Sequence, residues 1–228
     1  MKAASYMWPS FFIKKFLFPA RRKYFCSITR YHLVHIPGIL TLQDIEPYYN
    51  WRHLYTAEED ERSPFYDRIY SEFEFTNTIY NYYIHPQWDE FGSRTLYMKL
   101  LMVDYELNYA IIELLGEWND AIENDIMTLR REVADKLFAN GITKYILIAG
   151  NVLNFHSSDD SYYENWREEV VEEGGWIAIV NMPEQSQYDF RKARLTNYIQ
   201  LIDFPQWRTH KPELVFQQID NMMIRLLH

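Results

Sequence analysis

The sequence predicts an α/β fold with a mixed, mostly parallel sheet that is covered by helices. Four apolar runs of strand length alternate along the chain with segments of helical character. Strands separated by helical segments imply crossover connections, which place neighbouring strands in parallel. The four runs are 109–115, 145–150, 176–181 and 198–203.

A β-hairpin is predicted at the start of this alternation. Segments 95–103 and 109–115 are rich in strand-forming residues, and 104–108 between them has loop composition. We expect Gly116 to end the second strand of the hairpin.

The clearest helix is predicted over 120–140. Asp120 with Glu123 resembles a capping box, and Asn140-Gly141 suits a helix end. Apolar residues recur at three- and four-residue steps, so we expect them to face the sheet. These residues are Ile122, Ile126, Leu129, Val133 and Leu137.

Three further helices complete the alternation. One follows the N-cap candidates of 157–160 and ends near Glu172, a weaker one covers 183–196, and the last begins near Pro212. The apolar positions expected on the first are Tyr162, Trp166 and Val170, and those on the last are Val215, Ile219, Met222 and Leu226.

Charge divides the chain unevenly. The whole sequence has a net charge of −9, which argues against a nucleic-acid partner. Residues 1–43 hold seven Lys and Arg and no acidic residue, so 44–228 keeps 16 basic and 32 acidic residues, a net charge of −16. Such asymmetry marks a tail. We predict a poorly ordered basic aromatic tail over 1–36, a connector with an extended aromatic segment that packs on the main domain over 37–94, and an α/β domain over 95–228.

Three interpretations of 1–30 stay open. Its aromatic residues, interspersed with cations, suit weak contact with a membrane surface, which would make the chain a membrane-peripheral protein. Its basic, acid-poor composition also suits an organelle presequence. It could equally be an extension that does not pack, from an upstream start codon, with Met7 as another candidate start. No apolar run reaches membrane-spanning length.

Cys26 is the only cysteine, so no disulfide can form within the chain. This fits a reducing compartment, and we expect a cytoplasmic protein. No Cys and His spacing resembles a zinc site, and we predict no cofactor. The aromatic run 80–88 is expected to cover the domain as a strand, with a recognition surface as the alternative.

Several local sequences carry a family resemblance. Segment 111–120 combines an apolar strand, Gly116 and an acidic helix start, while 145–158 combines a central strand with a following His-Ser-Ser sequence. Together with 180–184 and the order of elements, they resemble the STAS domain of bacterial anti-sigma-factor antagonists and sulfate-transporter tails, over about 95–228. In antagonists a partner kinase phosphorylates the loop serine, which the resemblance places at Ser157. The family's neighbouring Asp and Gly are His156 and Asp159 in this chain.

The loop from 151 to 160 and the helix after it are predicted to be the functional surface. They follow the central strand, at the sheet edge where α/β folds place ligands and partners. We expect a non-catalytic regulatory module that binds a protein partner here, because no complete catalytic set is present. The interaction residues are Asn151, Asn154, His156, Ser157, Ser158, Asp159 and Tyr162.

An enzyme is the alternative. His156, Asp159 and Asp160 follow the central strand, and Asp120 leaves the neighbouring strand at the same edge. A histidine and several carboxylates near each other suit a divalent metal or a general base, which predicts a metal-assisted hydrolase or phosphotransfer enzyme. Ordinary helix capping by Asp159 and Asp160 explains the same residues.

Overall fold

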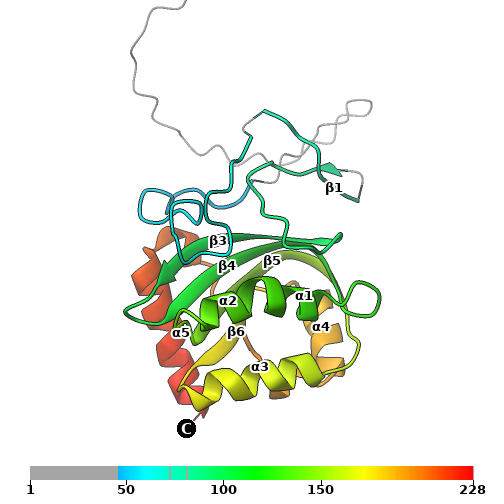
Figure 1. The fold of residues 1–228 in the computed structure, drawn as a ribbon. Helices are drawn as coiled ribbons and strands as arrows, with labels where there is room; N and C mark the ends of the chain where they lie inside the picture. The colour runs from blue at the N-terminus through cyan, green and yellow to red at the C-terminus, as the bar shows by residue number, and fades with distance from the viewer. Residues whose placement is uncertain (1–45, 72, 81, 228) are drawn as a thin grey trace, which may run out of the picture. The chain divides into compact units, whose positions relative to one another are not determined.

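A computed structural model describes residues 46–71, 73–80 and 82–227. The predicted tail over 1–36, with its three interpretations, lies outside these ranges. The described chain contains a five-stranded sheet with the order β3-β4-β5-β6-β7 (Figure 1). The strands span Leu96–Asp104, Tyr109–Asn119, Lys144–His156, Trp176–Val180 and Gln200–Ile202, respectively. β3 and β4 are antiparallel and all other neighbours are parallel, so the predicted hairpin and mostly parallel sheet are confirmed.

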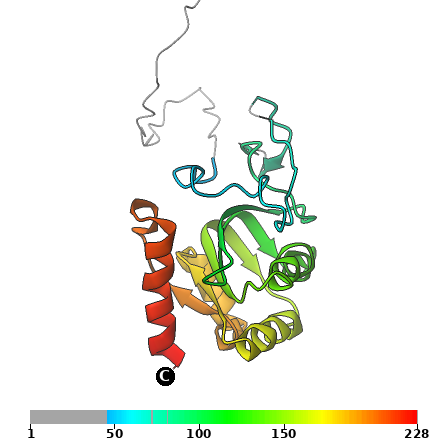
Figure 2. The same ribbon diagram turned by 60° about the vertical axis from the view of Figure 1, so that its left-hand side comes forward.

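Helices cover both faces of the sheet, with α5 alone on one face and the other α-helices on the opposite face (Figures 1 and 2). Because side chains alternate along a strand, Ile111 and Ile146 pack under α5, while Ile112 and Leu147 face the other helices. The helical segments are α1 Asp125–Leu129, a π-helical turn Arg130–Ala134, α2 Asp135–Phe138, α3 Ser161–Glu172, α4 Glu184–Lys192 and α5 Pro212–Leu227. Short 3₁₀ turns span Leu195–Asn197 and Trp207–Thr209, and flank β7.

The first crossover helix begins later than the sequence predicts. It starts at Asp125, after Asn124 in a left-handed conformation with φ 53°. The capping box was wrong, because an Asp120 carboxylate oxygen accepts a hydrogen bond from the Ile126 amide at 2.9 Å. Ile122 therefore lies in the preceding turn and is 78% exposed. The rest of the predicted apolar face, from Ile126 to Leu137, is buried as expected.

Gly116 does not end β4, contrary to the prediction. The strand continues to Asn119, with a register shift next to Gly116. Gly116 has φ +121°, and a Cβ there would lie 2.2 Å from the Thr95 carbonyl oxygen. The glycine thus serves close backbone approach at a bulge rather than a chain reversal.

β5 also runs further than predicted. The segment 151–156, expected to be loop, is the second half of this strand. Its pairing with β6 stops at Ile148, but its pairing with β4 continues to His156. Val152 and Phe155 are buried in the core, and the Ser186 hydroxyl from α4 donates to the Val152 carbonyl at 3.0 Å. These contacts, together with pairing to β4, keep the segment 151–156 in an extended conformation although it contains several polar residues.

The faces of the later helices differ from prediction in detail. On α3, Trp166 and Val170 are buried as expected, but Tyr163 rather than Tyr162 is the fully buried tyrosine. On α5, Val215 and Ile219 are buried as predicted. Further along α5 the predicted face was wrong. Met223 rather than Met222 is the fully buried methionine, Met222 is partly buried, and Leu226 is exposed.

The segment before β3 covers part of the α5 side of the sheet. β1, Thr78–Ile79, and β2, Tyr82–Tyr83, form a two-stranded antiparallel ribbon. Beyond it, Ile84 and Trp88 are buried against Tyr97 of β3 and Leu115 of β4. In contrast, the three tyrosines at positions 80, 82 and 83 are exposed. The aromatic run therefore divides into a buried half and an exposed half.

On this side of the sheet, the buried Glu113 of β4 lies between the apolar cluster under α5, which includes Ile111, and the cluster that includes Leu115. The Glu113 side chain, 1% exposed, accepts from Arg208 Nη2 at 2.9 Å and from the Tyr48 amide at 2.8 Å. Lys99 stands opposite Glu113 on β3. Burial raises the pKa of Glu113, while the Tyr48 amide and Arg208 act in the opposite direction.

Among the described residues, no helix is long and apolar enough to cross a membrane.

Candidate interaction surface

The carboxyl ends of β4 and β5 lie next to each other, and the start of α3 follows β5 closely in the chain. The two strands end side by side, since Asn119 pairs with His156 and the Asp120 amide donates to the His156 carbonyl at 2.9 Å. α3 begins at Ser161, after four intervening residues. We call this the β5–α3 surface, and it comprises Asn151, Leu153, Asn154, His156, Ser157, Ser158, Asp159 and Tyr162. All the predicted interaction residues are in it, and His156 to Asp159 are exposed.

Glu117 organises the polar side chains at the strand ends. Its Oε1 lies 3.2 Å from His156 Nε2 and accepts from Asn119 Nδ2 at 3.0 Å. Its Oε2 accepts from the Tyr80 hydroxyl at 3.2 Å, and Asn154 Nδ2 donates to that hydroxyl at 2.7 Å. The groups thus satisfy one another, which fixes their orientation on the surface.

Leu153 is the apolar side chain of this surface. The register of β4 against β5 skips it, because Gly116 pairs with Val152 and Glu117 pairs with Asn154. A residue left out of the ladder at a bulge is re-aimed relative to its neighbours. Leu153 is 53% exposed, although the residues on both sides of the skip are held by the sheet.

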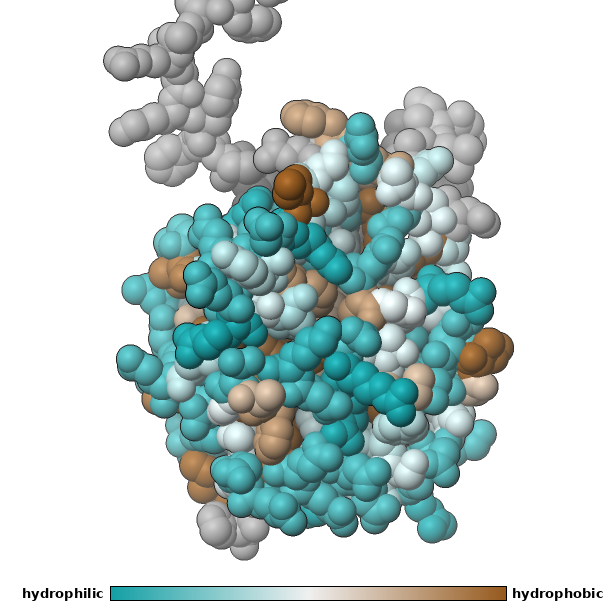
Figure 3. Space-filling model, in the orientation of Figure 1, coloured by the Kyte–Doolittle hydropathy of each residue, from teal (hydrophilic) through white to brown (hydrophobic). Residues whose placement is uncertain are grey.

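The two aspartates before α3 are engaged in hydrogen bonds within the chain. Asp159 Oδ1 accepts from the Ser161 amide at 2.9 Å, and hydrogen bonds from Ser161 lower the pKa of Asp159. Asp160 Oδ2 accepts from the Tyr198 hydroxyl at 2.9 Å. Ser157 and Ser158 precede them and are exposed. Figure 3 shows a largely hydrophilic surface over α3 and its neighbours.

Asp120 is part of the scaffold beneath this surface. Its carboxylate accepts from Trp118 Nε1 at 2.9 Å, the Ile126 amide at 2.9 Å and the Tyr163 hydroxyl at 2.5 Å. Burial raises the pKa of Asp120 to about 6, although these three donors oppose the shift and Asp125 adds to it. The carboxylate links the end of β4, the first crossover and α3.

The four predicted metal ligands do not form a metal site in the described structure. Within 46–71, 73–80 and 82–227, no group of three or more His, Cys, Asp or Glu side chains could hold a metal ion. Asp120 is turned into the core, Asp159 accepts from the Ser161 amide, and Asp160 accepts from the Tyr198 hydroxyl. His156 is paired with Glu117. Asp160 is the N-cap residue of α3, but its side chain makes no capping hydrogen bond, so helix capping accounts for these residues only in part.

Two residues of the surface escaped sequence reasoning. Leu153 was not selected, because its exposure depends on a register skip between strands distant in sequence. Tyr80 reaches the site from a ribbon 74 positions before Asn154, and no local pattern indicates that contact. The central role of Glu117 rests on its side-chain contacts, which no local sequence pattern indicates.

The fold defines an α/β domain whose antiparallel hairpin leads into parallel strands. No family model matches the chain, and no curated protein matches it either. Among solved structures, the anti-sigma factor antagonist SpoIIAA in its unphosphorylated form is similar with a TM-score of 0.41 and 16% identity, over 54% of this chain and 96% of that chain. A putative anti-sigma factor antagonist from Thermotoga maritima has a TM-score of 0.38 and 21% identity, over 48% and 88% of the two chains.

The phosphorylated form of the Bacillus cell fate determinant SpoIIAA is similar with a TM-score of 0.37 and 16% identity, over 54% of this chain and 98% of that one. These structures are of anti-sigma-factor antagonists, which is the class of protein that the sequence resembles. At such low identity the likeness concerns the fold alone. It does not identify what this chain binds.

Proposed function

We propose that the chain is a non-catalytic regulatory module that binds a protein partner through the β5–α3 surface. The observation that carries this proposal is Leu153, a half-exposed leucine on a hydrogen-bonded strand, between Asn151 and Asn154. Protein interfaces commonly centre on apolar anchors with a polar rim. The β5–α3 surface supplies both within one short stretch of chain.

The rigidity of the surface supports binding. Both sides of Leu153 are fixed by pairing with β4, so little backbone freedom is lost when a partner docks. The polar groups are similarly prearranged, because His156, Asn119 and Tyr80 all contact Glu117. Preorganised contacts give more affinity than the same contacts on a mobile loop.

The same contacts favour binding over catalysis. The Asp120 carboxylate is engaged by three donors within the core, so it cannot act as a general base on a bound substrate. Ser157 and Ser158 remain exposed beside the start of α3. A phosphate on Ser157 would add charge where a partner docks, next to Asp159. This gives the surface a means of regulation.

Affinity capture with matched variants tests the proposal. Immobilised full-length protein, Leu153→Asp and Ile224→Asp are used to capture binding proteins from cells of the source organism, followed by mass spectrometry. Ile224 is the control, because it is 48% exposed on α5, away from the β5–α3 surface. Circular dichroism must show that all three proteins are folded. We expect Leu153→Asp alone to lose the partner.

A second variant addresses regulation. Ser157→Glu places charge near the start of α3, where the helix dipole favours it by a few tenths to about 1 kcal/mol, so folding should survive. We expect this variant to capture less partner than Ser157→Ala. Equal capture by the wild type, Leu153→Asp and Ser157→Glu would exclude the β5–α3 surface as the docking site.

A further inference from the structure

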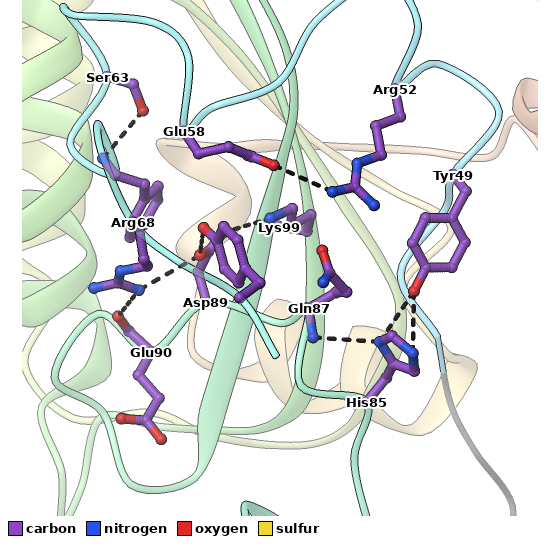
Figure 4. Close-up of polar contacts among 12 residues, drawn as sticks. Tyr49, Arg52, Glu58, Ser63, Arg68, His85, Gln87, Asp89, Glu90 and Lys99 are labelled. Carbon is purple, nitrogen blue, oxygen red and sulfur yellow. Dashed lines mark hydrogen bonds and ion pairs between the residues drawn. The ribbon is translucent and has the colours of Figure 1, made fainter. Parts of the chain in front are cut away.

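A second group of chemically notable residues lies away from the β5–α3 surface, where the segment before β3 meets that strand. Asp89 forms an antiparallel bridge with Met98, which places its side chain next to Lys99 (Figure 4). Glu58 approaches from the other side of the same cluster (Figure 4). The exposed fractions of the side chains are 0% for Asp89, 13% for Lys99 and 17% for Glu58.

Three polar atoms of this cluster are buried without a hydrogen-bond partner. They are Lys99 Nζ, Asp89 Oδ2 and Glu58 Oε2. Lys99 Nζ and Asp89 Oδ2 lie 3.4 Å apart, longer than a good charged hydrogen bond. Leaving such atoms unsatisfied destabilises the folded state, and more so when they are charged.

The other oxygen of Asp89 is held by donors. Asp89 Oδ1 accepts from the Tyr70 hydroxyl and from Arg68 Nη1, the latter at 3.4 Å. The Tyr70 ring also lies against Lys99, with Nζ 3.8 Å from the ring centroid. Donors fixed on one carboxyl oxygen can stabilise negative charge that develops there during attack on the carbon. The second oxygen is then left facing the amine.

We propose that Lys99 and Asp89 condense to form an amide cross-link between their side chains, with Glu58 as the proton carrier. The neutral Lys99 amine attacks Asp89 Cγ, and the resulting charge on Oδ1 is stabilised by Tyr70 and Arg68. Glu58 takes one proton from the nitrogen and returns it to Oδ2. The Nζ–Cγ bond forms and the Cγ–Oδ2 bond breaks. Oδ2 leaves as water, which carries the acid's own proton and the proton transferred by Glu58.

The surroundings favour the reactive protonation states. Burial lowers the pKa of Lys99, and Asp89 and Glu58 oppose this change while Arg52 adds to it. Burial raises the pKa of Asp89, against the effects of Lys99, Tyr70 and Arg68. Both directions favour the neutral amine and the neutral acid, which are the forms that condense. Holding them in contact supplies the high effective concentration that an uncatalysed amide formation lacks.

The product also suits its environment better than the reactants. Condensation replaces two groups that are charged in water by one neutral amide, which is less costly to bury than an isolated charge. It also ties the connector covalently to β3. The cross-link would join Asp89, in the segment before β3, to Lys99 in β3. It is independent of the proposed binding function.

Mass spectrometry of the folded, full-length protein tests the proposal directly. After overnight incubation at neutral pH, the intact mass should be lower than the mass calculated from the sequence by one water molecule. Trypsin should fail to cleave after Lys99, so that peptide 69–94 appears joined to peptide 95–130. Fragmentation must locate the junction at Asp89 and Lys99.

Variants separate the cross-link from other losses of water. Lys99→Met should show the full mass of its sequence, whereas Asp89→Asn should lose ammonia in place of water. Glu58→Gln should slow the reaction, and its neighbour Glu59, exposed on the same turn, provides the control Glu59→Gln, which should react fully. An unreduced mass in the folded wild type overturns the proposal. A water loss confined to one unbranched peptide overturns it as well.

Discussion

Replacing Asp120 by asparagine should make the stability of the protein less dependent on pH. Asparagine keeps an oxygen that can accept from Trp118 Nε1 and the Ile126 amide, and its amide can donate to the Tyr163 hydroxyl. The fold should therefore be retained. What the substitution removes is the buried negative charge that links the end of β4 to α3.

The magnitude follows from the pKa of Asp120. Burial raises this pKa from 3.8 to about 6, which corresponds to about 3 kcal/mol between the folded and unfolded states. Because the folded pKa is the higher one, the stability contributed by neutral Asp120 is fully present below about pH 4 and is lost as the pH rises through about 6. The difference in unfolding free energy, Asp120→Asn minus wild type, should therefore grow by about 3 kcal/mol as the pH is raised from below about 4 to well above about 6.

Urea unfolding followed by tryptophan fluorescence, at a series of pH values from about 4 to 8, measures this difference. Other buried carboxylates titrate in both proteins, so the subtraction isolates Asp120. Asp159→Asn is the control, since Asp159 is exposed and its pKa is lowered, so its variant should not gain stability as the pH rises. A difference between Asp120→Asn and wild type that stays constant with pH would refute the reasoning.

Three further predictions concern the core and the backbone. Val133→Asp should abolish cooperative unfolding by circular dichroism, because Val133 is fully buried and an unpaired charge there costs several kcal/mol, on the order of the whole folding free energy. Gly116→Ala should lower the melting temperature far more than Gly141→Ala, because both have positive φ but only Gly116 places the new Cβ against backbone. Arg208→Ala should lower the stability in urea unfolding, because it leaves Glu113 buried without its cation, but by less than the cost of about 3–5 kcal/mol for a fully buried pair, since the Arg208 side chain is 52% exposed; a wild-type stability would contradict that pairing.

The order of elements was readable because it rests on local patterns. The apolar repeat from Ile126 to Leu137 identifies a helix without any knowledge of its neighbours. The errors arose where a local signal had a different tertiary use. Gly116 is a turn residue by composition, but in the structure it permits close approach to Thr95. Gly150 and Asn151 look like a strand end, but pairing with β4 carries the strand past them.

The position of the candidate surface remains a prediction from the sequence, and its side-chain contacts could not be foreseen from it. Polar residues after a central strand indicate a site at the sheet edge, and 151–160 was selected on that basis. Which side chain becomes the apolar anchor depends on the β4–β5 register, and that register is not encoded locally. The cluster of Glu58, Asp89 and Lys99 was likewise invisible, because its members come from separate segments and only folding makes them neighbours.

The buried Glu113 has a consequence for where an independently folding unit can begin. The α/β pattern starts at about residue 95, but the cover over Glu113, Leu115 and Tyr97 comes from residues 46–88. A protein shortened to 95–228 would expose the Glu113 carboxylate and the apolar side chains of Tyr97 and Leu115, which are buried in the longer chain. We therefore expect a fragment that keeps residues 46–94 to be more stable and more soluble than one that begins at residue 95.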